Sequence, residues 1–380
     1  MSTFLPVALL LGLSLTGFKS LHLFATSNNL VSHYTHILTT NHMPSGLPIN
    51  PITTNHRFPP IDWQIRAVTI FSLVFAEDLT HLDTTLVGVL FLGAWAPSWA
   101  LIVLESLRAC NGYGSHWTSW ITIPGIVIFN QGHAVFSSLW LAVLVIWQPS
   151  GYAGAAELAV GRHDAVAIVV SFVVGYVIPI VLSALPAPGY VSWKVKQSVC
   201  GLYQQWNVWI VLVHHACVYV MRRGDVVGIG QAASQSPEES WRYLRLTYSF
   251  VFLLAAVPWW IVLATCAVQY LRRGSKGRRA QGGSLFKQVF VPTLPFASRK
   301  CRGVHEGFKW LIQWDHIIGT LATCVWAFVL YDRFLRAHGV EETGVQVIWK
   351  CAMYAAVGGP VAIPVGLLYE RDRMALARLD

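Results

Sequence analysis

One apolar stretch constrains the fold of this chain more than any other, because it is long enough to cross a bilayer and yet contains a carboxylic acid. The stretch is FKWLIQWDHIIGTLATCVWAFVLY, residues 308–331, with Asp315 and His316 inside it. At about 1.5 Å per residue, Asp315 would lie roughly 10 Å along a helix from Phe308. A carboxylate at that depth is costly in lipid, so it is expected to face protein or a water-filled cavity. Two hypotheses follow: Asp315 only pairs helices, or it works as an acid within the membrane.

The rest of the composition agrees with a membrane protein. The chain has 380 residues, of which 54% are hydrophobic and 12% are charged, whereas soluble domains carry about 25% charged residues. The apolar segments follow one another without a polar domain between them, which predicts one integral membrane domain over residues 1–380. The net charge of +9 does not indicate nucleic-acid binding, because one loop holds much of it. We therefore expect the protein to contact the lipid bilayer and to bind no nucleic acid.

The apolar pattern predicts an all-α transmembrane bundle of about eight or nine spans. The spans cover approximately residues 4–18, 61–78, 85–104, 118–147, 164–185, 203–221, 246–270, 308–331 and 350–369. Residues 23–60 are rich in Thr, Asn, His and Pro and are predicted to form a polar loop.

The loop 271–307 fixes the predicted orientation. It contains nine Lys or Arg residues and a single acid, Glu306, so the positive-inside rule predicts that it is cytosolic. Counting spans outward from this loop places Arg108 and the basic residues of 371–373 on the same side. The N-terminus is then expected on the opposite side.

Polar side chains recur at helical spacing inside several spans. Asn130 and His133 share a face of one span, and His214 and His215 lie in another. A single polar residue of this kind usually joins helices by a hydrogen bond. Because several spans carry such faces, we expect a polar-lined cavity, with Asn130, His133 and His215 as candidate substrate-binding residues.

Acids and aromatic rings together indicate a chemistry for this cavity. The acids available near this cavity are Asp315, Glu105, Glu77, Asp78 and Asp83. Asp78 and Trp314 are further candidates for substrate binding. A buried carboxyl group can hold a proton and act as a general acid without a metal or cofactor. The chain also has 17 Trp, 18 Phe and 13 Tyr, and aromatic faces stabilise cations. The combination suits carbocation chemistry on an apolar substrate.

Several enzyme classes lack their sequence signals here. There is no DDxxD-like pair for a magnesium-diphosphate site, no HExxH zinc motif, no His-rich di-iron cluster, no GxSxG and no Walker motif. The seven cysteines contain no CxxC pair, which argues against a zinc site and a disulfide framework. We therefore predict no metal and no cofactor.

Three segments resemble one protein family. They are FAEDLTHLD (75–83), LESLRACNGY (104–113) and FKWLIQWDHIIGTLATCVWA (308–327), and they are similar to fungal membrane-bound terpene cyclases of meroterpenoid pathways, of the ascofuranone and macrophorin type. The resemblance implies protonation of a terminal epoxide or olefin on a farnesyl chain carried by an aromatic or polyketide head, followed by cyclisation of the cation. It implies an acidic donor, for which Asp315 is the first candidate catalytic residue and Glu105 and Glu77 are the others. We expect the protein to lie in the membrane of the endoplasmic reticulum.

Two other functions stay open at this stage. A transporter or receptor-like bundle is the first, and a membrane acyltransferase that uses His133 or His215 is the second. For the cyclase hypothesis, Gly319 lies one helical turn after Asp315 and is expected to leave room for a substrate chain to approach the carboxyl group.

Overall fold

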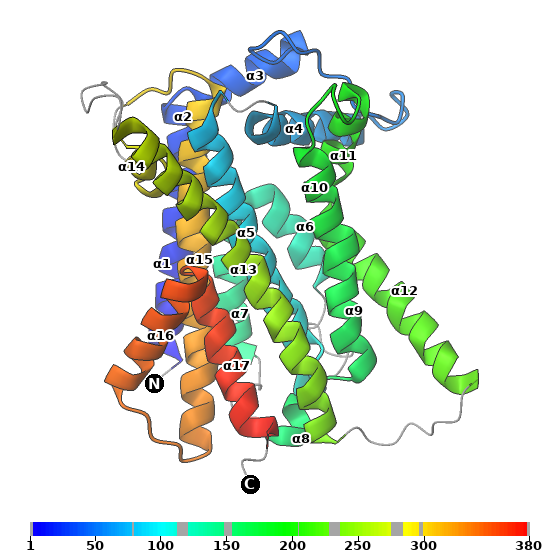
Figure 1. The fold of residues 1–380 in the computed structure, drawn as a ribbon, viewed down its shortest axis with the longest axis vertical. Helices are drawn as coiled ribbons and strands as arrows, with labels where there is room; N and C mark the ends of the chain where they lie inside the picture. Colours follow the sequence, from blue (N-terminus) through cyan, green and yellow to red (C-terminus); the bar gives the residue numbers. More distant parts are fainter. Residues whose placement is uncertain are drawn as a thin grey trace.

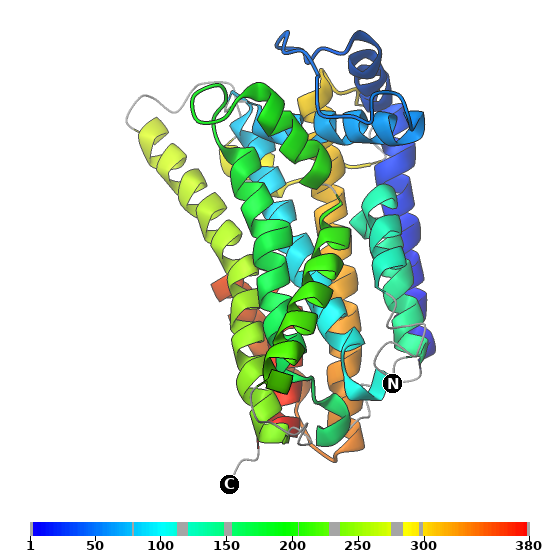
Figure 2. The same ribbon diagram turned by 90° about the vertical axis from the view of Figure 1, so that its right-hand side faces the viewer.

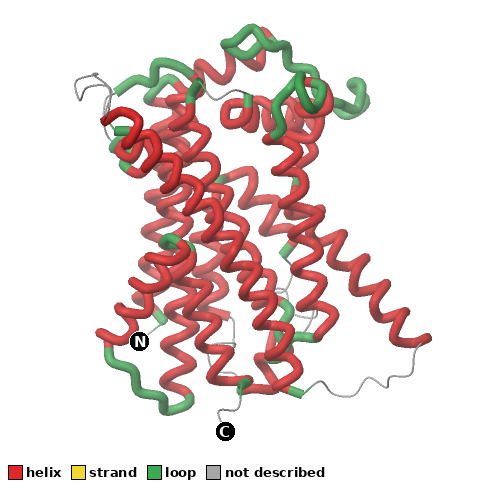
Figure 3. The backbone as a smooth tube through the Cα atoms, viewed as in Figure 1, coloured by secondary structure: helices red, strands yellow, loops and turns green. Residues whose placement is uncertain are grey.

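The computed structural model is a helical bundle with two distinct ends (Figure 1). It describes residues 3–77, 80–111, 121–147, 154–203, 205–227, 236–274, 284–295 and 299–377. We call the end that carries α3 (Leu30–Thr40) and α4 (Pro59–Ala76) the upper end, and the end that carries both termini the lower end. Over the described ranges the regular structure is helical (Figure 3), apart from one isolated bridge between His42 and Pro48. The all-α prediction is confirmed.

Five helical segments in the described ranges are long and apolar enough to cross a membrane. They are Phe4–Ser27, Leu82–Ser106, Ala155–Ala184, Pro237–Arg272 and Val304–Ala337. Their elements are α1 (Phe4–Phe18), η1 (Lys19–Leu23), α2 (Phe24–Ser27), α5 (Leu82–Ser106), α8 (Ala155–Leu158), α9 (Arg162–Phe172), η6 (Val173–Val177), α10 (Ile178–Ala184), α13 (Pro237–Gly274) and α15 (Val304–Ala337). Five candidate spans do not confirm the predicted eight or nine. Three of the predicted spans account for much of the difference, because they do not form single crossings of the bundle.

The first of these predicted spans is residues 61–78. They belong largely to α4, which lies across the upper end and does not cross the bundle (Figure 2). The carboxylate of Asp62, in its first turn, accepts hydrogen bonds from the backbone N–H groups of Thr54 at 2.6 Å and His56 at 2.9 Å. These bonds hold the start of the helix against the preceding polar segment. That segment is also more ordered than the predicted loop 23–60, because it contains α2 and α3.

The second is residues 118–147, which form a hairpin. α6 (Thr122–Gln131) ends at Gly132, and the chain then continues through η4 (His133–Ser137) and α7 (Ser138–Trp147). Gly132 has φ +94°, a conformation that glycine adopts without steric cost. The returning arm runs beside α1 toward the lower end, where Arg333 donates to both Val145 O at 2.7 Å and Thr3 Oγ1 at 3.2 Å. Residues 118–120 lie outside the described residues.

The third is residues 350–369, which form another hairpin. α16 (Gly344–Gly358) and α17 (Ala362–Leu376) are 15 residues each and meet at Gly359, φ +78°, followed by Pro360. The C-terminus therefore lies at the lower end (Figure 1), whereas α14 (Leu285–Phe290) in the basic loop lies at the upper end. The placement of 371–373 and Arg108 on the side of the basic loop was wrong, because hairpins were counted as crossings.

The remaining elements complete the bundle around a shared core. α11 (Trp193–Tyr203) packs against α4 at the upper end, and α12 (Trp206–Val227) packs along α9 toward the lower end. Trp99, Trp206 and Trp326 are completely or almost completely buried between the helices. Together these contacts leave a space beneath α4 that the next section describes.

Candidate functional site

A cavity of about 430 Å³ lies between α4 and the upper halves of α5 and α15. Its volume falls within the range of roughly 300–1,000 Å³ that is usual for small-molecule sites. Aromatic side chains form a large part of its wall: Tyr34, Trp63, Phe71, Phe91, Trp95, Phe129 and Phe308. Among the described residues, no lysine or arginine lines it. The cavity therefore suits an apolar and uncharged ligand.

Asp315 is the one carboxylic acid among the described residues of the cavity wall. It projects from α15 and is 3% exposed. Its Oδ1 accepts a hydrogen bond from the backbone N–H of Ala134 at 2.6 Å. Ala134 lies in the first turn after Gly132, where the helix carries unpaired N–H groups and partial positive charge. The α6–α7 hairpin thus places a helix N-terminus inside the bundle, against the acid.

Gly132 makes this approach possible. A methyl group at Gly132 would lie 2.4 Å from Leu21 Cδ2 and 3.2 Å from Asp315 Oδ1, and its positive φ disfavours any side chain. Glycine is needed both for the reversal and for the contact with the acid. Gly132 is a functional residue that the sequence reasoning missed, although an isolated glycine within an apolar segment weakens the prediction of a continuous helix.

His133 lies next to the acid but outside the cavity wall. It is 1% exposed, its Nδ1 is 2.7 Å from Ser137 Oγ, and its Nε2 has no hydrogen-bond partner among the described residues. The imidazole packs on Gly319, where an added Cβ would be 2.0 Å from His133 Cδ2. The prediction that Gly319 leaves room for a substrate chain was therefore wrong, because His133 occupies that room.

Amide side chains form the mouth of the cavity. Gln64 of α4 donates through Nε2 to Asn130 Oδ1 at 2.9 Å, and Trp63 beside it is 56% exposed. His22 Nε2 lies 3.3 Å from Gln131 O. Asn130 was predicted as a binding residue and does line the cavity, whereas Gln64 and Trp63 were missed because α4 was read as a span.

The other predicted residues lie elsewhere. Trp314 points away from the cavity and donates its Nε1–H to Thr293 O at 2.8 Å. His215 is exposed on α12, with Nδ1 2.9 Å from Val211 O. Glu77 follows α4 and accepts a hydrogen bond from Ser45. Asp78 lies outside the described residues. The cavity thus brings Asp315 and Asn130 together, with His133 behind them.

Glu105 belongs to a separate buried cluster at the lower end. Its carboxylate contacts Arg108 Nε and Arg371 Nη2, both at 2.6 Å. Asp372 contacts Arg108 Nη2 at 2.6 Å and accepts from Tyr248 OH at 2.7 Å. All four charged side chains are fully buried. Burial by itself lowers the pKa of Arg108, but the carboxylates of Asp372 and Glu105 outweigh this and hold it above its ordinary value. Two carboxylates and two guanidinium groups give a neutral cluster.

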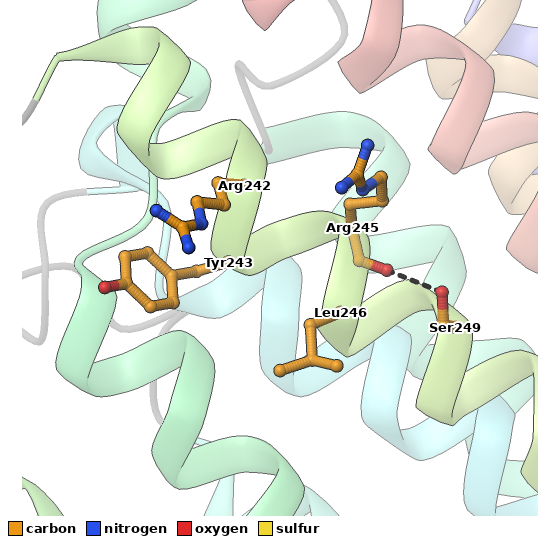
Figure 4. A pocket seen from close by; sticks show the side chains of 5 residues that line it. All are labelled: Arg242, Tyr243, Arg245, Leu246 and Ser249. Carbon is orange, nitrogen blue, oxygen red and sulfur yellow. Dashed lines mark hydrogen bonds between the residues drawn. The ribbon is translucent and has the colours of Figure 1, made fainter.

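A second cavity, of about 370 Å³, lies on the surface of α13 (Figure 4). Arg242, Tyr243, Arg245, Leu246 and Ser249 line it, and all of them belong to one helix. It shares no residue with the cavity beneath α4. In neither place, nor elsewhere in the described ranges, do three or more His, Cys, Asp or Glu side chains gather as a group that could hold a metal ion.

Comparison with known proteins places this chain in a family. Residues 6–376 match the model of the CtvD domain. Over 372 residues the chain is 22% identical to the terpene cyclase atmA of Aspergillus flavus, covering 95% of this chain and 94% of that one. It is 26% identical over 305 residues to the terpene cyclase ascI of Acremonium egyptiacum (77% and 72% covered), and 24% identical over 305 residues to the terpene cyclase ctvD of Aspergillus terreus (78% and 79% covered).

No solved structure matches the chain. The resemblance noted from the three sequence segments is confirmed, since the family model covers almost the whole chain. The protein therefore belongs to the CtvD-domain family.

Proposed function

We propose that this protein is a membrane-bound terpene cyclase that starts its reaction by protonating the substrate. The observation that carries the proposal is a carboxyl group, Asp315, in the wall of a cavity lined mainly by aromatic and aliphatic side chains. The proposed substrate is a prenyl chain, of farnesyl type, attached to an aromatic or polyketide head. The relatives named terpene cyclases support the reaction class. We also propose that the bundle is integral to the membrane of the endoplasmic reticulum.

In the proposed reaction, the protonated carboxyl of Asp315 gives its proton to the oxygen of a terminal epoxide or to a terminal olefin. With an epoxide, the carbon–oxygen bond breaks and leaves a carbocation beside the new hydroxyl group. The electron pair of a neighbouring double bond then forms a carbon–carbon bond and moves the cation along the chain. A base finally removes a proton, so the reaction is an isomerisation with no net change in atoms. The hydrogen bond from Ala134 to Oδ1 would hold the carboxyl in one orientation.

The aromatic wall would stabilise the cation as it moves. Trp95 and Phe129 are stacked, with ring centroids 5.6 Å apart and planes inclined by 6°, and both line the cavity. A desolvated cation over such a face gains about 2 kcal/mol or more. The same rings exclude water, which would otherwise trap the cation as an alcohol.

The polar mouth would receive the oxygen-bearing end of the substrate. Gln64 and Asn130 bind each other, and each amide has further hydrogen-bonding capacity for a hydroxyl or carbonyl group. A diphosphate would instead require cations, since Arg and Lys are the side chains that bind phosphate strongly. Because none lines the cavity, an uncharged head is the better candidate.

A transporter or receptor-like function is the second candidate. The observation that favours it is the pair of interrupted hairpins, α6–α7 and α16–α17, since transporters often bind substrates at broken helices. The cyclase proposal has the additional support of the terpene cyclases to which the chain is similar.

The proposed activity can be tested in microsomes from yeast that expresses the chain. A farnesylated phenol and its terminal epoxide would be supplied separately, and products would be separated and weighed by mass spectrometry. We expect a new product with the same mass as the substrate and fewer double bonds, absent from microsomes with an empty vector. Saturable uptake of an unchanged substrate into sealed vesicles, with no isomer formed, would favour the transporter instead.

A further inference from the structure

The outer face of α13 carries a mainly apolar stripe that begins beside two arginines, Arg242 and Arg245. Arg242, Leu246, Ser249, Leu253, Val257 and Trp260 follow one another at helical spacing. Leu246, Leu253, Val257 and Trp260 are 59%, 56%, 50% and 52% exposed. At about 1.5 Å per residue, the stripe is roughly 27 Å long, close to the thickness of a bilayer's hydrocarbon core, about 30 Å.

The arginines at its lower end have no acidic partner in the part of the chain that the structure describes. Arg242 and Arg245 are exposed and line the surface cavity, together with Leu246. Neither is among the residues that form ion pairs or other electrostatic interactions there. Figure 4 shows both guanidinium groups extending from the helix, and the Ser249 hydroxyl bonded to the backbone carbonyl of Arg245, at 2.9 Å. Two guanidinium groups without an acidic partner in the described ranges therefore lie at the lower end of the apolar stripe.

We propose that this stripe binds one anionic phospholipid, with the phosphate at Arg242 and Arg245 and an acyl chain along Leu246 and Leu253. Arginine pairs with phosphate oxygens through parallel hydrogen bonds. The apolar strip explains why the ligand is a lipid and not a soluble phosphate, because a free ion would leave Leu246 and Leu253 uncovered. The site lies outside the cyclisation cavity and does not depend on the proposed activity.

The test uses the full chain, purified in a neutral detergent, and compares binding of phosphatidylglycerol with binding of phosphatidylcholine by native mass spectrometry and thermal melting. We expect preferential retention of phosphatidylglycerol and a raised melting temperature. The double variant Arg242→Gln/Arg245→Gln should bind phosphatidylglycerol roughly 30-fold more weakly. This factor assumes that each arginine contributes as much binding free energy as a basic residue does at an anionic membrane surface. Arg223→Gln/Arg336→Gln is the matched control, because it removes two exposed arginines from other helices.

Two further arms make the result decisive. Leu246→Gln/Leu253→Gln should weaken phosphatidylglycerol binding while leaving the arginines in place. Inorganic phosphate and glycerol phosphate should give no thermal shift. The proposal is overturned if either soluble phosphate stabilises the protein as well as the lipid does, or if the Arg242/Arg245 variant retains as much lipid as the control variant.

Discussion

Two of the buried carboxylates, Asp315 near the upper end and Glu105 at the lower end, have different surroundings. Glu105 touches two guanidinium groups at 2.6 Å, whereas Asp315 accepts a hydrogen bond from the backbone N–H of Ala134, at the N-terminus of a broken helix. Asp315 borders a cavity and Glu105 lies in a closed, neutral cluster. Burial alone therefore does not separate the proposed catalytic acid from the acid proposed to be structural. Their hydrogen-bond and ion-pair partners are what differ.

The comparison implies different costs when each environment is disturbed. Removing one member of a buried ion pair leaves an uncompensated charge in a medium of low polarity. Asp315 forms no ion pair with a described lysine or arginine, so changes around it should act mainly on geometry and chemistry. The following predictions test this division, in order of decreasing expected effect.

The largest effect on stability is expected for Arg371→Met, because it leaves Glu105 and Asp372 with one guanidinium group between them. Breaking a buried pair in this way costs about 3–5 kcal/mol. The yield of monodisperse protein in detergent and its melting temperature should both fall sharply. Arg373→Met is the control, since Arg373 lies two residues later and its side chain is 47% exposed. Equal melting of the two variants would show that the lower cluster does not hold the bundle together.

A smaller effect is expected for Gly319→Ala. The added methyl would collide with the His133 ring, at 2.0 Å from Cδ2, and overpacking of this kind costs about 1–3 kcal/mol. Ala134 follows His133 and binds Asp315, so a shift of His133 should also move the acid. We therefore expect a clear loss of turnover per folded molecule beside the loss of stability. Gly12→Ala is the control, since nothing lies within 4 Å of a methyl group there. Unchanged turnover in Gly319→Ala would separate His133 from the geometry of the acid.

A modest effect is expected for Gln64→Leu at the mouth. Loss of a neutral hydrogen bond is worth about 0.5–1.5 kcal/mol, which corresponds to a rise in KM of roughly 2- to 13-fold, with little change in kcat. The measurement compares a substrate with a free phenol and its methyl ether. If the variant affects both equally, Gln64 does not contact the hydroxyl group.

No effect is expected from metal removal. Protonation by a carboxyl group requires no divalent cation, so activity in microsomes should be the same with and without excess EDTA. Restoration of a lost activity by added magnesium would instead indicate ionisation of a diphosphate, and it would exclude Asp315 as the initiating acid.

The sequence predicted the features that depend on local composition. The helical class, the interior position of Asp315 and the place of Asn130 follow from hydropathy and helical spacing. The partners of Glu105 could not be found in this way, because Arg371 is 266 residues away along the chain. The hairpins were missed because an apolar segment interrupted by Gly132 or Gly359 has the same composition as a continuous span. Only the backbone reversal shows that the N-terminus of η4 meets Asp315.

The central claim is that Asp315 supplies or holds the initiating proton and that Glu105 does not. The direct measurement is turnover per folded molecule for Asp315→Asn and for Glu105→Gln, with folding checked by elution in detergent. We predict that Asp315→Asn elutes normally and loses about 10²- to 10⁴-fold in rate, as is typical when a general acid is removed. Glu105→Gln should instead lose yield, while the protein that folds keeps most of its turnover. Normal specific turnover of Asp315→Asn, or a folded but inactive Glu105→Gln, would contradict this account.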